Sequence, residues 1–225
     1  METYAKVAAV LRQNGLTQQA DTLVVQADRD IAAIVDATSK ARAYAIVARE
    51  FQAAGFTQQA NTNFDRMLQS LQGNSDEKAQ QLLDIIYLFS ESKQVDLALK
   101  AFRAIPTDVT YTSVNAGGVI NASLEAKRID VAIAAAQAER MAETKTEALI
   151  RIAQWQLENQ TPSQTASTLA LAVQAAKTIA DPEVRRVPIY SVDGSQSGTD
   201  EDLYDQAIGD WKSRLQGRNP PARIS

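Results

Sequence analysis

Gly15–Ala20 reads GLTQQA, and Gly55–Ala60, 40 residues further along the chain, reads GFTQQA. Self-similarity at a fixed period of about 20 to 50 residues is typical of stacked-repeat proteins, in which each unit buries its apolar face against its neighbours. The repeated phrase therefore predicts a repeat protein. A protein of this kind offers a binding surface rather than a reaction centre.

The series extends beyond these two copies. Lys93–Ala98 and Lys127–Ala132 resemble each other closely, and Thr161–Ala166 is a weaker fifth member, so that the closing alanines are spaced by 40, 38, 34 and 34 residues. Before each turn, apolar positions recur at helical spacing, which indicates an amphipathic helix. The residues four positions before each turn are Leu11, Phe51, Phe89, Ser123 and Leu157. The residues eight positions before each turn are Val7, Val47, Ile85, Val119 and Ala153. The residues eleven positions before each turn are Tyr4, Tyr44, Leu82, Ala116 and Ile150.

With these features the chain resembles the tetratricopeptide repeat family over roughly residues 1–180. The resemblance implies an all-α, right-handed solenoid of about five antiparallel helix pairs, with units at about 1–40, 41–78, 79–112, 113–146 and 147–180. The chain departs from the family in three ways: the tryptophan usual early in the first helix is missing, the closing proline is absent, with Pro106 the nearest candidate, and the first two units are long. An irregular helical bundle is the alternative.

The fourth unit departs most from the pattern. Asn115–Gly118 is predicted to fall inside its first helix, where each glycine costs about 1 kcal/mol relative to alanine. Ser123 occupies the slot that Phe51 and Phe89 fill in earlier units. This unit is either a drifted repeat or a place where glycines let a ligand or a neighbouring backbone approach.

After the repeats, residues 181–199 are rich in Pro, Gly and Ser and are predicted to form a linker. A last helix is predicted over residues 200–215, with an apolar face of Leu203, Ala207, Trp211 and Leu215. We expect Leu203, Trp211 and Leu215 to pack near 169–173, where Ala170 leaves room. The helix would then cap the array; the alternatives are a ligand for the groove and a free tether.

Composition restricts the chemistry. The chain has 225 residues, no Cys, no His, and a net charge of −4. These counts exclude disulfides, Cys/His zinc sites and histidine-based catalysis, and no basic block indicates a nucleic-acid ligand. No run of about 18 apolar residues predicts a membrane span. Asp193–Tyr204 resembles a calcium loop but lacks the final glutamate. We therefore expect no enzyme activity, no cofactor and no metal.

In the tetratricopeptide family, the first helix of each pair lines the concave surface. Carried over, this geometry predicts a groove that includes Ala5 and Ala9 and that binds a segment of another protein. The partner-binding residues predicted for it are Arg12, Arg42, Arg49, Gln52, Tyr87, Asn121, Arg151 and Trp155. The alternative function is a structural subunit that forms a homo-oligomer, or joins a larger complex, through its ends and its last helix. The sequence predicts a soluble protein without fixing its compartment, which is cytoplasmic or periplasmic.

Overall fold

The structure is a computed structural model that describes residues 2–109, 114–159 and 162–179. All regular secondary structure in these residues is α-helical, which confirms the predicted all-α class. The chain divides into two compact units, residues 1–138 with α1 to α8 and residues 139–225 with α9 and α10. The helices are α1 Glu2–Gln13, α2 Thr17–Ala32, α3 Ala37–Ala53, α4 Thr57–Ser70, α5 Ser75–Glu91, α6 Val95–Arg103, α7 Gly117–Glu125, α8 Ile129–Gln137, α9 Ala142–Glu158 and α10 Pro162–Ala176.

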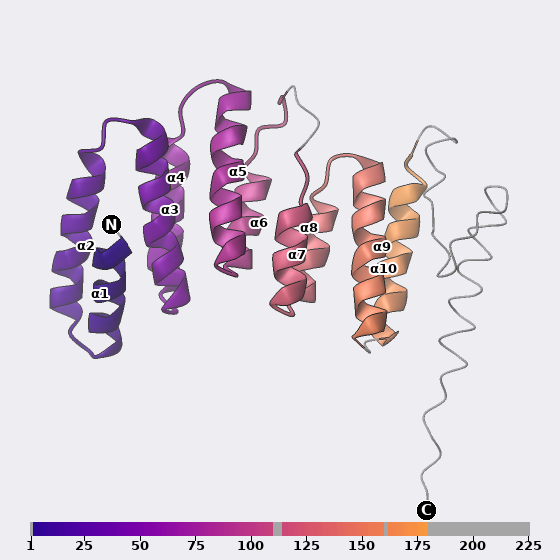
Figure 1. Cartoon of the computed structure of the whole chain (residues 1–225), viewed down its shortest axis with the longest axis horizontal. Coiled ribbons are helices and arrows are strands. Elements are labelled where there is room, and N and C mark those ends of the chain that lie inside the picture. The colour runs from indigo at the N-terminus through magenta and orange to yellow at the C-terminus, as the bar shows by residue number, and fades with distance from the viewer. Residues whose placement is uncertain (1, 110–113, 160–161, 180–225) are drawn as a thin grey trace, which may run out of the picture. The chain divides into compact units, whose positions relative to one another are not determined.

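In the first unit, consecutive helices pack as hairpins, α1 with α2, α3 with α4, α5 with α6, and α7 with α8. The first helices of neighbouring hairpins also contact one another, from α1 through α3 and α5 to α7. Figure 1 shows α3, α5 and α7 each lying in front of the second helix of its own hairpin. In the second unit, α9 packs on α10.

The four turns inside the hairpins of the first unit have the same backbone geometry. After each first helix, one residue adopts a positive φ, at Gly15 (76°), Gly55 (83°), Lys93 (56°) and Lys127 (57°). The next amide then donates a hydrogen bond of 2.8 or 2.9 Å to the carbonyl five residues earlier. This is the Schellman arrangement that ends helices. These four turns therefore share one backbone geometry, at the positions where the sequence predicts a turn.

The core of the first two hairpins joins α1 and α2 to α3 and α4. Phe51 is fully buried there with Val47, Ile31 and small alanines. Its ring meets Phe56 edge-on, with 6.3 Å between the centroids. Alanines allow the helices to approach closely, and Phe51 with the aliphatic residues around it supplies apolar surface whose burial stabilises the fold.

Polar side chains connect the second helices of neighbouring hairpins. Arg66 of α4 pairs with Asp28 of α2 at 2.5 Å, and Lys100 of α6 donates to Asn61 of α4. The guanidinium of Arg128, at the start of α8, donates to both carboxylate oxygens of Asp96 of α6, at 3.0 and 3.1 Å.

Arg128 also donates to Asp130 on its own helix, at 2.8 and 3.0 Å. Hydrogen bonds from Arg128 lower the pKa of Asp130. The hydrogen bonds that Arg128 donates raise its pKa, the one to Asp130 contributing more than the one to Asp96.

The fourth hairpin differs from the prediction. Its first helix, α7, begins at Gly117, so both glycines stand in the first turn instead of the helix interior. The side chain of Asn115 accepts a hydrogen bond from the amide of Gly117 at 3.0 Å. Ser123 is fully buried in the predicted slot, and its hydroxyl donates to the carbonyl of Val119 at 2.7 Å. The cost of burying this hydroxyl is offset within its own helix.

In the second unit, the predicted register is wrong by one residue. Ala166, expected to be buried, is exposed, while Thr165 is fully buried in its place. On α9, Gln156 is fully buried and Leu157 only partly so. The spacing between the last two equivalent positions of the repeat series is therefore 33 residues, from Ala132 to Thr165, and not the predicted 34. Polar side chains fill these slots, and apolar periodicity could not locate them.

Two other predictions concern the ends of the chain. Val7, expected on the buried face of α1, is 44% exposed. The predicted linker 181–199, the helix 200–215 with Leu203, Trp211 and Leu215, and the calcium-like loop lie outside the described residues.

Candidate functional site

The exposed sides of α3, α5 and α7 form one surface of the first unit, which we call the first-helix face. It is made of three rows of residues at equivalent repeat positions, each row running from α3 through α5 to α7. The rows are Ile46, Asp84 and Gly118; Arg49, Tyr87 and Asn121; and Ala53, Glu91 and Glu125. The middle row contains three of the predicted binding residues.

Tyr87 stands at the centre of this face. Its side chain is 65% exposed, unusual for a large aromatic residue, and its hydroxyl donates to Glu91 one turn later at 2.6 Å. This hydrogen bond raises the pKa of the Tyr87 phenol. The contact holds the ring along α5 and leaves its apolar surface open to a partner.

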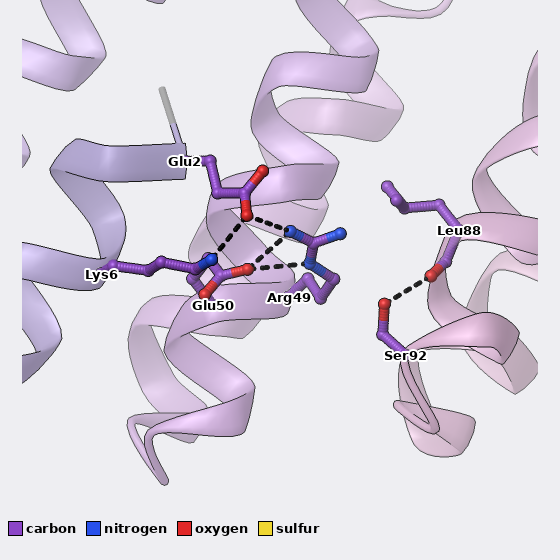
Figure 2. Close-up of polar contacts among 6 residues, drawn as sticks. All are labelled: Glu2, Lys6, Arg49, Glu50, Leu88 and Ser92. Carbon is purple, nitrogen blue, oxygen red and sulfur yellow. Dashed lines mark hydrogen bonds and ion pairs between the residues drawn. The ribbon is translucent and has the colours of Figure 1, made fainter.

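Arg49 is less accessible than the sequence suggested, because its side chain is only 16% exposed. Figure 2 shows its guanidinium between Glu50 of the same helix and Glu2 of α1. It donates to Glu50 at 2.6 and 2.9 Å, and a nitrogen lies 3.4 Å from the Glu2 carboxylate. The guanidinium of Arg49 therefore links α3 to α1 through its ion pair with Glu2.

Glu2 also accepts from Lys6 at 2.6 Å, one turn along α1. That bond is the main reason why the pKa of Glu2 is lowered and the pKa of Lys6 is raised. The four side chains thus form an alternating row of charges, from Lys6 through Glu2 and Arg49 to Glu50.

Arg12 is likewise engaged within the fold. It pairs with Asp21 across the first turn, and its guanidinium carbon lies 5.7 Å from the centre of the Phe56 ring. A cation over an aromatic face is attracted by the ring electrons. Arg12 therefore contacts Asp21 of the first hairpin and Phe56 of the second.

The remaining predicted residues fall in different environments. Arg42 and Asn121 are exposed on α3 and α7, and Gln52 is partly buried near the end of α3. Ala5 and Ala9, expected to line the groove, are 2% and 6% exposed and belong to the core. Arg151 is exposed and Trp155 partly buried on α9 of the second unit.

Sequence reasoning missed the acidic residues of the face. Asp84, Glu91 and Glu125 lie one helical turn from Tyr87 or Asn121, at repeat positions that the same register would have supplied. Arg49 is paired with carboxylates, so these residues give the α5 and α7 part of the face an acidic character around Tyr87, while Arg42 is exposed near the start of α3.

The described residues contain no cluster of three or more His, Cys, Asp or Glu side chains able to hold a metal ion. A cavity of about 230 Å³ lies between the end of α4, the start of α5 and the segment after α6. It is smaller than the pockets of about 300 to 1,000 Å³ that hold small-molecule ligands. Among the described helices, none combines the length and the apolar character needed to cross a membrane.

Comparison of the chain with protein-family models, curated proteins and solved structures found no match.

Proposed function

We propose that this protein is a non-enzymatic interaction module, a solenoid of helix pairs that holds a segment of a partner protein on the first-helix face. The observation that carries the proposal is the exposed ring of Tyr87 between Arg49 and Asn121. Tyrosine is enriched among residues that dominate binding energies, because it combines a large apolar surface with a polar end.

The packing of the helices supports a groove on this side. First helices contact one another in each neighbouring pair from α1 to α7, whereas among the second helices α6 contacts α8 but α2 and α4, and α4 and α6, approach each other less closely. An array whose members are closer on one side curves toward that side. The curvature favours the first-helix face as the inner surface.

The charges of the face indicate the chemistry of the partner segment. Asp84 and Glu91 flank Tyr87, and Glu125 lies one turn after Asn121, while Arg49 is already paired. A segment with an apolar or aromatic anchor beside Lys or Arg would complement this surface. Its anchor would pack on Tyr87, and its cations would lie near the carboxylates.

The test is to capture partners from the source cell with the full chain, identify them by mass spectrometry, and measure the affinity of the purified complex. Tyr87→Ala should weaken binding at least about 30-fold, the effect of losing a hot-spot residue. Val25→Ala, an equally apolar surface change on α2, is the matched control and should leave the affinity unchanged. Circular dichroism should show the same helix content in both variants.

Full affinity in Tyr87→Ala together with Asn121→Ala would contradict the assignment of the face. A partner that instead lost affinity in Val25→Ala would place binding on the second helices.

A further inference from the structure

The part of the first-helix face that α5 and α7 form carries an aromatic ring among carboxylates. Tyr87 is exposed, and Asp84 and Glu91 lie one turn before and one turn after it on α5. On α7, Asn121 and Glu125 are exposed at the positions equivalent to Tyr87 and Glu91. We call these five residues the acidic patch.

The carboxylates of the acidic patch are not neutralised by cations. In the described part of the chain, neither Asp84 nor Glu125 forms an ion pair, and Glu91 accepts a hydrogen bond from the neutral phenol one turn earlier. The lysines that follow these two helices, Lys93 and Lys127, belong to the turns. A surface that combines several carboxylates with an open aromatic ring attracts a segment that is both cationic and aromatic.

The chain itself contains a segment of this chemistry, after the described residues. Residues 211–218 read WKSRLQGR, a tryptophan followed by three cations, with no carboxylate among them. Residues 200–210 instead carry five carboxylates and no cation, so the charge of the chain changes sign at Trp211. The other tryptophan, Trp155, has a glutamine on each side. Residues 211–218 therefore combine the aromatic anchor and the cations that the acidic patch would attract.

We propose that the acidic patch binds residues 211–218 of its own chain. Trp211 packs on the exposed ring of Tyr87, and Lys212 and Arg214 lie beside the carboxylates. The segment then occupies the surface that a partner protein would use and competes with it, an inference that rests on the proposed function of this face. The chain would thus regulate its own binding surface.

The spacing of the patch suits such a segment. Asp84 and Glu91 are seven residues apart on α5, with Tyr87 between them, which places them about 10 Å apart along the helix axis. Packed helices lie about 8–10 Å apart, so Glu125 on α7 is at a similar distance from Glu91. Cations one and three residues after a tryptophan can therefore meet carboxylates on more than one side of the ring.

The length of the chain permits this contact. Trp211 stands 32 residues after Ile179, the last of the described residues. A chain of that length spans up to about 100 Å when extended, whereas four hairpins of about 10 Å each extend over about 40 Å. A tethered ligand whose linker spans the distance acts at an effective concentration in the millimolar range. Even a contact of millimolar affinity would therefore occupy the patch for much of the time.

The first experiment follows the fluorescence of Trp211 in the full chain. Trp155→Phe leaves Trp211 as the single tryptophan. We expect its emission to be blue-shifted and protected from quenching by acrylamide, and we expect Tyr87→Ala to move both values to those of a free tryptophan amide. Val25→Ala, an apolar surface change on α2, is the matched control and should leave both values unchanged.

The charges of the patch are tested in the same way. Asp84→Asn together with Glu125→Gln should move the emission toward the free value at low salt, where surface charges are least screened. Asp65→Asn, which removes an exposed carboxylate from α4, should not. Free-tryptophan emission in the parent would overturn the proposal. So would a blue-shifted emission that Tyr87→Ala does not change, because Trp211 would then pack on another surface.

The second experiment uses the absence of cysteine, which makes introduced thiols unique. In a chain with Asn121→Cys and Ser213→Cys, mild oxidation should form a disulfide within one molecule. The matched control, Val25→Cys with Ser213→Cys, should oxidise more slowly, because Val25 lies on α2 and outside the patch. Equal rates for the two pairs would overturn the proposal. A disulfide that joins two molecules would overturn it as well, since the segment would then bind another copy.

Partner binding separates this inference from the proposed function. Lys212→Glu with Arg214→Glu should make the captured partner bind at least about threefold more tightly, since the face is then free for more of the time. Unchanged affinity, with Tyr87→Ala still losing the partner, would overturn this inference and leave the proposed function standing. If Tyr87→Ala releases Trp211 without changing partner affinity, the segment is a ligand of the patch and the proposed function is wrong.

Discussion

The second and fourth hairpins share a turn but differ in nearly everything around it. Gly55 and Lys127 adopt positive φ angles of 83° and 57°, and the same hydrogen bond closes both turns. Yet the slot four residues earlier holds Phe51 in one hairpin and Ser123 in the other, both fully buried. The comparison teaches that the backbone of the turn defines the repeat, while the core side chains vary to fit the local spacing.

The largest difference should appear in the core. Phe51→Ala removes a fully buried ring and should lower the free energy of unfolding by about 3–5 kcal/mol. Ser123→Ala removes a hydroxyl that bonds only within α7, so it should cost about 1 kcal/mol or less. Urea unfolding of the full chain, followed by circular dichroism, measures both. Equal losses would contradict the view that the size of the buried side chain sets how much each slot stabilises the fold.

A smaller effect should come from exchanging the turn residues. Lys127→Gly relieves a left-handed backbone, and Gly55→Lys imposes one. We expect a gain and a loss of about 1 kcal/mol, respectively, because a non-glycine residue in this region is strained. A Cβ at Gly55 would meet no atom within 4 Å, so steric clash should not add to the loss. Thermal unfolding gives both values, and a stabilising Gly55→Lys would refute the strain argument.

The smallest effect concerns pH. Asp130 of the fourth hairpin has a lowered pKa through its bonds with Arg128, whereas the equivalent position in the second hairpin is Gln58. A carboxylate with a lowered pKa stabilises the fold above its unfolded pKa of about 3.9, and this contribution disappears as the pH falls below it. Because the pair is exposed, it should be worth only about 0.3 kcal/mol.

The measurement is the difference in melting temperature between the parent and Asp130→Asn, which should be present at pH 6 and shrink toward pH 3. The matched control, Gln58→Asn, should show no such dependence. A difference that grows as the pH falls would contradict the sign of the shift.

The sequence could predict the helix pairs and their turns because glycine, lysine and alanine recur at fixed distances from apolar residues. It could not place the start of α7, since Asn115–Gly118 fits both a helix interior and a helix beginning. The register of α9 and α10 was missed because Gln156 and Thr165 are polar and give no apolar signal. The exposure of Tyr87 and Asn121 on the first-helix face could be predicted from their position alone. The pairing of Arg49 with Glu2 was not, because it depends on how two hairpins meet.

The polar links between second helices give the first unit two layers with different responses to salt. The first helices are held together largely by buried apolar surface, which moderate salt affects little. The contacts of Arg66 with Asp28 and of Arg128 with Asp96 are partly exposed ion pairs, which dissolved ions screen within about 10 Å at 0.1 M. Raising the ionic strength therefore loosens the second-helix side more than the first-helix side, where the pair of Arg49 with Glu2 adds to the buried apolar contacts. The resistance of the first unit to bending therefore depends on the salt concentration as well as on the sequence.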